Sequence, residues 1–245
     1  MIINLWSTPR TGSNWYASYL YNDAKKINQN ALLFSQYLNY FHFINYIKPK
    51  LTDWIYTYEK NSSYPNYSFD WLRKSIKLSY HQGKRIKTPE EEEEYRIELL
   101  ERHDHEKNPL ILSNHILPMS ERSYNYLFTK ANKNIFIYRQ NIKNQLASYA
   151  LAYTTQIWKP KKDFKPLENI HTDKGVIKNL YDRIIYWHSL DKTNCEVIKY
   201  EDINFSNNTQ IKIEKQNKID PFIQLDAETQ NYILELCEDF KKYLN

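Results

Sequence analysis

The sequence predicts an α/β fold in a single domain, with a mostly parallel central sheet flanked by helices. Short, fully apolar runs alternate along the chain with longer stretches of helical periodicity. A strand buried on both faces reads as a continuous apolar run, and helices make the crossovers between parallel strands. The 245 residues suffice for one domain spanning residues 1–245, with an ordinary 41% of hydrophobic residues. We expect strands at residues 2–6, 110–112, 135–138 and 197–200.

Helical patterns fill the segments between these strands. We expect helices over residues 13–21, 143–153 and 176–189, and an amphipathic helix over 226–244. The sequence Thr88-Pro89-Glu90 predicts a further helix start, with Thr88 as the N-cap and proline in the first turn. We expect the acidic run that follows to form a solvated helix face rather than a binding surface.

Composition narrows the classes of partner. The net charge is +5 and there is no long Lys/Arg run, so we expect no nucleic-acid partner. No apolar run approaches the ~20 residues of a membrane span. The first residues show no basic n-region followed by a long apolar h-region, so we expect no signal peptide and a cytoplasmic protein. The two cysteines predict no disulfide framework. The basic segment Lys159 to Lys165 is either a lid or a mobile surface loop.

The most informative segment is Thr-Pro-Arg-Thr-Gly-Ser-Asn-Trp at residues 8–15, between the first strand and the first helix. Backbone N–H groups converge at such a turn, and the helix dipole adds partial positive charge there. Arg10 supplies a fixed cation, and Gly12 is one of only three glycines in the chain. The segment lacks the lysine and the second glycine of a Walker A loop. It therefore predicts an anion site that does not hold ATP·Mg in the usual way.

Three further clusters follow the other strands, at the sheet edge where α/β proteins bind ligands. Arg139 ends the third strand and Ser148 lies on the helix after it, which predicts a second anion site or a structural ion pair. His115 follows the second strand, as a general base or as a hydrogen-bonded structural histidine. The Tyr-Glu-Asp turn at residues 200–202 offers a tyrosine for a nucleotide base. Its two acids are either Mg²⁺ ligands or a cap.

These four segments, in this order, resemble the sulfotransferases that use 3′-phosphoadenosine 5′-phosphosulfate (PAPS). Residues 8–15 are similar to their 5′-phosphosulfate loop, and Tyr138-Arg139-Gln140-Asn141 through Ser148-Tyr149 to their 3′-phosphate element. Asn114-His115-Ile116-Leu117-Pro118 is similar to their Thr-His-Leu-Pro segment, and Tyr200-Glu201-Asp202-Ile203 to their Tyr-Glu-Asp turn. The resemblance implies a P-loop-like sulfotransferase fold.

The resemblance also implies a role for each matching residue. Arg10 would neutralise the leaving phosphate oxygen, and His115 would take the proton from a hydroxyl or amine acceptor. Arg139 and Ser148 would hold the 3′-phosphate, and Tyr200 would lie near the adenine. PAPS would be the co-substrate, released as adenosine 3′,5′-bisphosphate (PAP), with no metal required. The remaining implied contacts are the phosphosulfate cradle formed by Thr11, Gly12, Ser13 and Asn14, and an adenine platform at Trp15.

The chain departs from the family pattern at three places. Nine positions separate Arg139 from Ser148, one more than in many members, and Gln140 stands where some bacterial members have a second arginine. The segment before His115 lacks a lysine that many members carry, and the Gly-rich basic C-terminal motif is absent. The pattern is therefore closest to bacterial or viral-type members. The acceptor is a small molecule, a glycan or a peptide, and the aromatic segment 37–58 either lines its pocket or belongs to the core.

Two other functions remain open from the residues alone. A P-loop-like small-molecule kinase would need a Walker lysine and a Mg²⁺-binding acid, and the loop offers neither in the usual place. A non-catalytic protein that binds adenosine bisphosphate would keep the same anion-binding residues without turnover.

Overall fold

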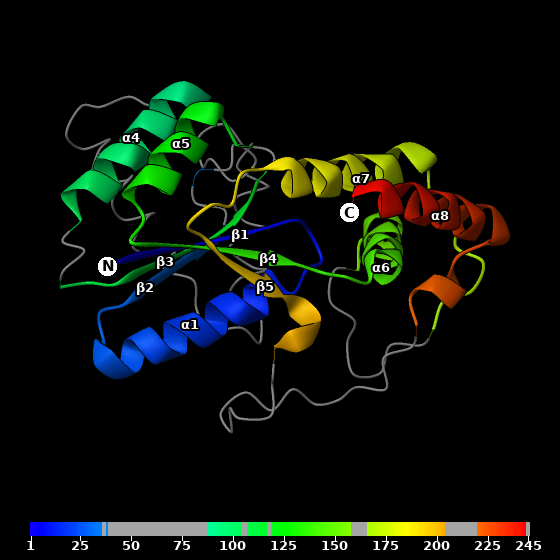
Figure 1. Ribbon diagram of the computed structural model, residues 1–245, viewed down its shortest axis with the longest axis horizontal. Coiled ribbons are helices and arrows are strands. Elements are labelled where there is room, and N and C mark those ends of the chain that lie inside the picture. Colours follow the sequence, from blue (N-terminus) through cyan, green and yellow to red (C-terminus); the bar gives the residue numbers. More distant parts are fainter. Residues whose placement is uncertain are drawn as a thin grey trace. The chain divides into compact units, whose positions relative to one another are not determined.

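In the computed structural model the chain forms two compact units, which are described separately (Figure 1). Unit 1 contains Met1–Ser7, Gly12–Phe136 and Asn194–Glu196, and unit 2 contains Thr8–Thr11, Ile137–Thr193 and Val197–Asn245. The expectation of one domain over residues 1–245 stays a prediction. The structure describes residues 1–35, 38, 88–103, 107–116, 119–157, 166–203 and 220–243.

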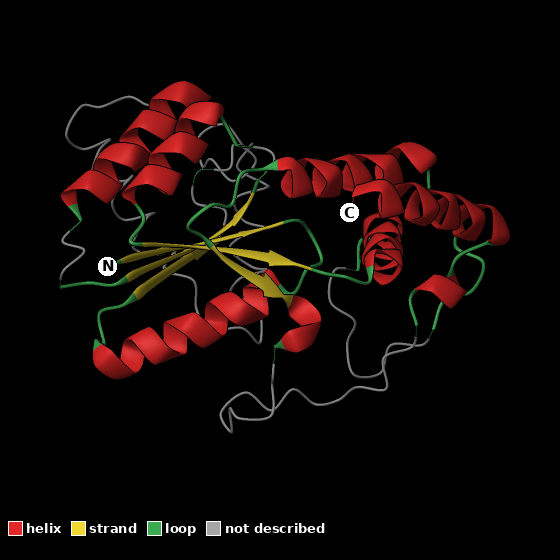
Figure 2. Cartoon of the chain, in the orientation of Figure 1, coloured by secondary structure: helices red, strands yellow, loops and turns green. Residues whose placement is uncertain are grey.

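The sheet has five parallel strands in the order β2-β3-β1-β4-β5, which confirms the predicted α/β class (Figure 2). All four predicted strands are present. The sequence analysis missed β2, although Leu32-Leu33-Phe34 is a short apolar run of the same kind. The strands are β1 Ile2–Ser7, β2 Leu32–Ser35, β3 Leu110–His115, β4 Lys133–Tyr138 and β5 Glu196–Lys199.

Helices cover both faces of the sheet in unit 1 (Figure 1). Helix α1 (Ser13–Ile27) lies on one face, and α4 (Pro89–Arg102) and α5 (Glu121–Lys130) lie on the other. Helix α5 is tied to β1 by a 2.6 Å hydrogen bond from Asn4 Nδ2 to the Leu127 carbonyl. The Trp6 ring lies 5.0 Å from the Tyr124 ring of the same helix. Leu5, the neighbour of these residues on β1, is fully buried, so both faces of the strand are covered.

The start of α4 confirms the helix predicted from Thr88-Pro89-Glu90. Thr88 is in the extended conformation, and its side chain accepts the backbone N–H of Glu91 at 3.2 Å. The Glu91 carboxylate in turn accepts the Thr88 N–H at 3.3 Å. This reciprocal capping box satisfies donors that a helix start otherwise leaves without partners.

The expectation of a solvated acidic face on α4 is wrong for two of its glutamates. Glu92 is 0% exposed and Glu93 is 3% exposed. Glu92 Oε1 accepts hydrogen bonds from Arg96 Nε at 3.1 Å and Nη2 at 2.7 Å. Glu93 accepts the hydroxyls of Ser120 and Ser123 at the start of α5. Partners on the next turn and on the neighbouring helix make it possible to bury carboxylates that composition alone places in solvent.

Unit 2 is built around three helices that share one apolar core. The predicted helices 143–153, 176–189 and 226–244 correspond to α6 (Ile142–Thr155), α7 (Lys174–Ser189) and α8 (Ala227–Phe240). The core includes Leu146, Ile177, Leu180 and Ile233, each with no exposed surface. This packing fixes the inner face of α6.

An aromatic cluster at the end of α7 surrounds His188. Its imidazole lies 5.9 Å from the Tyr138 ring, 4.8 Å from the Trp187 ring and 5.1 Å from the Phe240 ring. Burial, with a smaller contribution from Lys192, lowers the pKa of His188 from 6.5 to about 4. The side chain is therefore neutral at physiological pH.

Two expectations concern segments outside the described residues: the aromatic segment 37–58, of which only Leu38 is described, and the basic loop Lys159 to Lys165. Within the part of the chain that the structure describes, no helix is both long and apolar enough to cross a membrane.

Candidate functional site

Helix α1 begins without a side-chain cap. Its N-cap residue, Gly12, has φ 82° and ψ 11°, a left-handed conformation that glycine adopts without the steric cost borne by other residues. No acidic residue lies in the first turn. The N-terminus of α1 therefore combines the positive end of a helix dipole with the absence of a competing carboxylate on its own first turn. The five other described α-helices have side-chain caps from Thr88, Ser120, Asn141, Asp173 and Asp226.

The segment 8–11, which belongs to unit 2, brings Arg10 against α6. Arg10 Nε and Nη2 donate to Ser148 Oγ at 2.9 and 2.7 Å. Arg139 Nη1 also reaches the Arg10 carbonyl oxygen, at 3.5 Å. The structure thus joins the two residues predicted to form the 3′-phosphate site to the arginine predicted for the 5′ site. Since Ser148 Oγ accepts two N–H groups, its own hydroxyl hydrogen is left to donate elsewhere.

The backbone at Arg10 is held in an unusual conformation. Its φ of 66° lies in the left-handed region, where a residue with a Cβ is uncommon. Such conformations persist where the surroundings over-determine them, and they cluster at binding sites.

Gln145 of α6 helps to hold the segment 8–11 in this conformation. Its amide Nε2 donates to Thr8 Oγ1 at 2.8 Å and to the Pro9 carbonyl at 2.7 Å, and the residue is 1% exposed. Thr11 Oγ1 donates to the Thr8 carbonyl at 2.9 Å. Sequence reasoning missed Gln145. A signal was present, because this amide stands on the apolar face of α6, next to Leu146.

Arg139 lies near two residues of the turn at 200–202, Tyr200 and Glu201. Its guanidinium is 5.4 Å from the centre of the Tyr200 ring, a cation–π distance. Its Nε is 3.9 Å from Glu201 Oε1 and, among the described residues, has no hydrogen-bond partner. The site therefore holds a buried cationic N–H with capacity for a further acceptor.

Glu201 resolves one alternative that the sequence left open. Its Oε2 accepts the backbone N–H of Gln140 at 3.0 Å, and its Oε1 accepts that of Asn141 at 3.1 Å. Asp202 forms a 3.0 Å ion pair with Lys199. In this structure Glu201 caps the start of α6, which favours the cap over the Mg²⁺ ligand. No group of three or more potential metal ligands occurs among the residues that the structure describes.

The remaining predicted residues belong to unit 1. His115 is half-buried at the end of β3, where it pairs in register with Ser7, the last residue of β1. Before it, Asn114 is fully buried, and neither its Oδ1 nor its Nδ2 has a hydrogen-bond partner among the described residues. His115 therefore stands at the carboxyl end of a parallel strand, and its role as a base stays a prediction.

Trp15 lies in the first turn of α1 with Ser13 and Asn14. Its ring is half-buried and nearly parallel to that of Tyr19, with a 6.3 Å separation and an interplanar angle of 6°. The predicted site residues are divided between the two units. Unit 2 contains Arg10, Thr11, Arg139, Ser148 and Tyr200, and unit 1 contains Gly12, Ser13, Asn14, Trp15 and His115.

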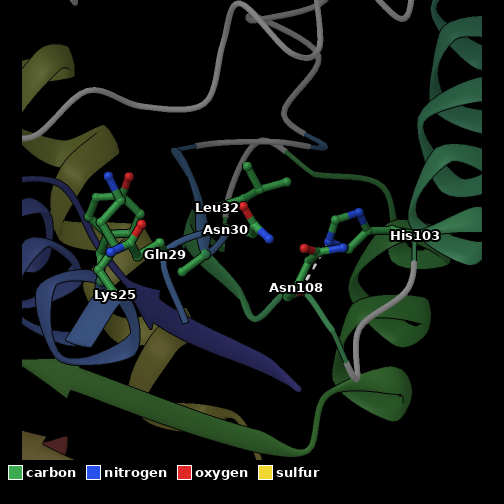
Figure 3. Close-up of a pocket in the computed structure, with 8 residues that line it drawn as sticks. Lys25, Gln29, Asn30, Leu32, His103 and Asn108 are labelled. Atoms are coloured by element: carbon green, nitrogen blue, oxygen red, sulfur yellow. Dashed lines mark hydrogen bonds between the residues drawn. The ribbon is translucent and has the colours of Figure 1, made fainter. Parts of the chain in front are cut away.

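Unit 1 also has a polar cavity of about 370 Å³ between the end of α1, the start of β2 and the loop after α4 (Figure 3). Lys25, Asn30 and His103 are among its lining residues, and His103 Nε2 lies 3.1 Å from the Asn108 carbonyl. No residue predicted for the anion site lines this cavity.

Comparison with known proteins gives no family assignment. No protein-family model matches the chain. No curated protein and no solved structure matches it significantly.

Proposed function

We propose that the chain is a sulfotransferase that moves a sulfuryl group from PAPS to a hydroxyl or amine acceptor. The observation that carries the proposal is the pair of hydrogen bonds from Arg10 to Ser148. These residues are 138 positions apart and were assigned separately to the 5′ and 3′ groups of one nucleotide. Arg139, the other 3′-phosphate residue, belongs to the same network through the Arg10 carbonyl.

The chemistry of this network suits a nucleotide with two anionic groups. The guanidinium groups of Arg10 and Arg139 match phosphate and sulfate oxygens, and Ser148 retains a hydroxyl hydrogen to donate. The uncapped N-terminus of α1 favours negative charge. In the proposal, Gly12, Ser13 and Asn14 hold the phosphosulfate through this turn, and Trp15 and Tyr200 contact the adenine.

The proposed reaction is an in-line displacement at sulfur. The acceptor oxygen or nitrogen forms a bond to sulfur, and the bond between sulfur and the 5′-phosphate oxygen breaks. His115 takes the acceptor proton, and Arg10 stabilises the negative charge on the leaving phosphate oxygen. The products are the sulfated acceptor and PAP. Positioning and electrostatic stabilisation supply the rate enhancement in this scheme, with no step assigned to a metal.

Calorimetry with PAP, ADP and ATP·Mg²⁺ tests the nucleotide assignment. We expect PAP to bind most tightly, because it alone carries phosphates at both the 3′ and 5′ positions. A clear preference for ATP·Mg²⁺ would contradict the proposal and favour a kinase. A transfer assay with radiolabelled PAPS and a mixed panel of alcohols, phenols, amines, glycans and peptides then tests turnover. Tight PAP binding without transfer to any acceptor would indicate a non-catalytic binding protein.

The His115→Ala variant tests the assignment of the base. Transfer should fall by about 10²–10⁴-fold, the usual contribution of general base catalysis. PAP affinity should stay within about twofold, because the proposed base contacts the acceptor rather than the nucleotide. His115→Gln is the matched variant, since it keeps a hydrogen-bonding side chain without a titrating base. Survival of activity in both variants would assign the proton transfer to another residue.

A further inference from the structure

Gln145 contacts the segment 8–11 through a single buried nitrogen. The amide Nε2 donates to Thr8 Oγ1 and to the Pro9 carbonyl, at 2.8 and 2.7 Å. The Pro9 carbonyl can only accept a hydrogen bond, so chemistry fixes which end of the amide faces the segment. Both contacts cross more than 130 residues of sequence. They therefore depend on the docking of α6 and not on local turn propensity.

The backbone of the segment 8–11 does little to stabilise its own conformation. Pro9 lacks a backbone N–H, and Arg10 has a φ of 66° without being glycine. The side-chain contacts just described, from Gln145, Thr11 and Arg139, act on the carbonyls of Thr8, Pro9 and Arg10. Gln145 is the most buried of these three residues, together with Thr11.

The amide is the side chain that fits this position. One amide nitrogen offers two N–H donors, which satisfy a hydroxyl and a carbonyl at once. A leucine of similar size would leave the Pro9 carbonyl buried without a donor. A glutamate would keep the shape but would bring a charged acceptor against two oxygens.

We propose that Gln145 is a positioning residue for the segment 8–11. It sets the backbone conformation from which Arg10 binds a 5′-phosphate or phosphosulfate. This inference rests on the proposed function for the identity of the anion. It adds a residue of α6 that acts through Thr8 and Pro9, without contact to the nucleotide.

The test compares Gln145→Leu with Gln230→Leu as a matched control. Gln230 makes the same kind of contact elsewhere in unit 2, with Nε2 donating to the Phe222 and Leu225 carbonyls at 3.1 and 2.8 Å. Affinities are measured for PAP and for adenosine 3′-monophosphate, which lacks the 5′ group. Limited trypsin digestion is run in parallel without ligand, and cleavage between Arg10 and Thr11 is quantified by mass spectrometry.

We expect Gln145→Leu to weaken the binding of PAP by roughly tenfold to a hundredfold, because a binding group is misplaced. The binding of adenosine 3′-monophosphate should weaken by less than about threefold. We also expect faster cleavage after Arg10. Gln230→Leu should change neither the ratio of the two affinities nor that cleavage. Gln145→Met, which keeps the length of the side chain without an N–H donor or a charge, should behave like Gln145→Leu, and it provides a second variant if the leucine variant does not fold.

The outcomes separate the two proposals. Equal losses for both nucleotides, or unchanged cleavage after Arg10, would overturn the role of Gln145. Wild-type protein that fails to bind PAP would overturn the sulfotransferase proposal instead. The cleavage comparison would then still decide whether Gln145 holds the loop.

Discussion

Helices α1 and α6 each follow a central strand of the sheet, but their N-termini differ in what satisfies them. At α6, the Asn141 side chain accepts the Asn144 N–H, and the Glu201 carboxylate accepts the N–H groups of Gln140 and Asn141. At α1, Gly12 offers no side-chain cap and the first turn has no acid. At the start of α6, side chains of the protein accept the free backbone N–H groups, so this helix start has a structural role. The start of α1 instead favours the binding of an anionic ligand. The 3′ selectivity we propose must then come from side chains, and the 5′ selectivity also from backbone.

The largest effect is expected when α1 is given its own carboxylate. Gly12→Asp should weaken PAP by about a hundredfold or more relative to Gly12→Asn, because like charges about 4 Å apart repel by a few kcal/mol near a protein surface. Asparagine and aspartate both tolerate the left-handed conformation, so the pair isolates charge from backbone strain. Calorimetry with PAP measures the difference. Equal affinities would show that no anion binds at the start of α1.

At α6, we expect the Arg139 side chain to provide the selectivity for the 3′-phosphate. Arg139→Ala should weaken PAP by roughly tenfold to a hundredfold, since a charge-assisted hydrogen bond contributes about 1.5–3 kcal/mol. Adenosine 5′-monophosphate, which lacks the 3′-phosphate, should lose little affinity. Arg139→Lys keeps the charge without the planar fork and serves as the control. Equal loss for both nucleotides would place the 3′-phosphate elsewhere.

Lowering the pH should destabilise α6 more than α1. Burial lowers the pKa of His188, in the unit that contains α6, from 6.5 to about 4. The unfolded chain therefore binds the proton more readily, and stability present above pH 6.5 is lost as the pH falls toward 4, by about 2 kcal/mol. Hydrogen exchange at pH 4.5 should show α6 amides losing protection relative to pH 7 more than α1 amides. His188→Phe, which cannot titrate, should remove that difference; its persistence would assign the acid sensitivity to other groups.

The smallest effect is expected when the Glu201 carboxylate that caps α6 is replaced by an amide. Glu201→Gln should lower the free energy of unfolding by about 1 kcal/mol, because it removes a charge from a helix N-terminus. The same change should raise PAP affinity by a few-fold, since a carboxylate near Arg139 is lost. Denaturant titration and calorimetry measure the two quantities. A loss of both stability and affinity would mean that Glu201 orients Arg139 for the ligand.

Most of the elements that were predicted correctly have local sequence signals. The apolar run of β1 and the N-cap at Thr88 each lie within a few residues of sequence, and both were predicted correctly. Helix α5 was not predicted, although Ser120 caps it and Glu121 follows in its first turn. The burial of Glu92 was predicted wrongly, because its partner Arg96 makes burial tolerable one helical turn away.

The candidate site shows the same division. Arg10, Arg139 and Ser148 were chosen because each stands after a strand or on the helix that follows it, and the structure joins them. Gln145 and the contact from Glu201 to α6 were missed. The first joins residues 136 positions apart, and the second joins residues 60 and 61 positions apart. Interactions at such separations depend on how helices and turns dock, and residue type alone carries little information about docking.

The hydrogen bonds from Arg10 to Ser148 and from Gln145 to Pro9 also determine when the loop takes its shape. They join segments 138 and 136 residues apart, so a long loop of chain must be closed before they form. During synthesis the segment 8–11 leaves the ribosome early and waits for α6 to emerge and dock. The first residues to be synthesised thus become competent to bind only after the chain up to Ser148 has been made. Ligand binding through Arg10 would report that folding has advanced at least as far as Ser148.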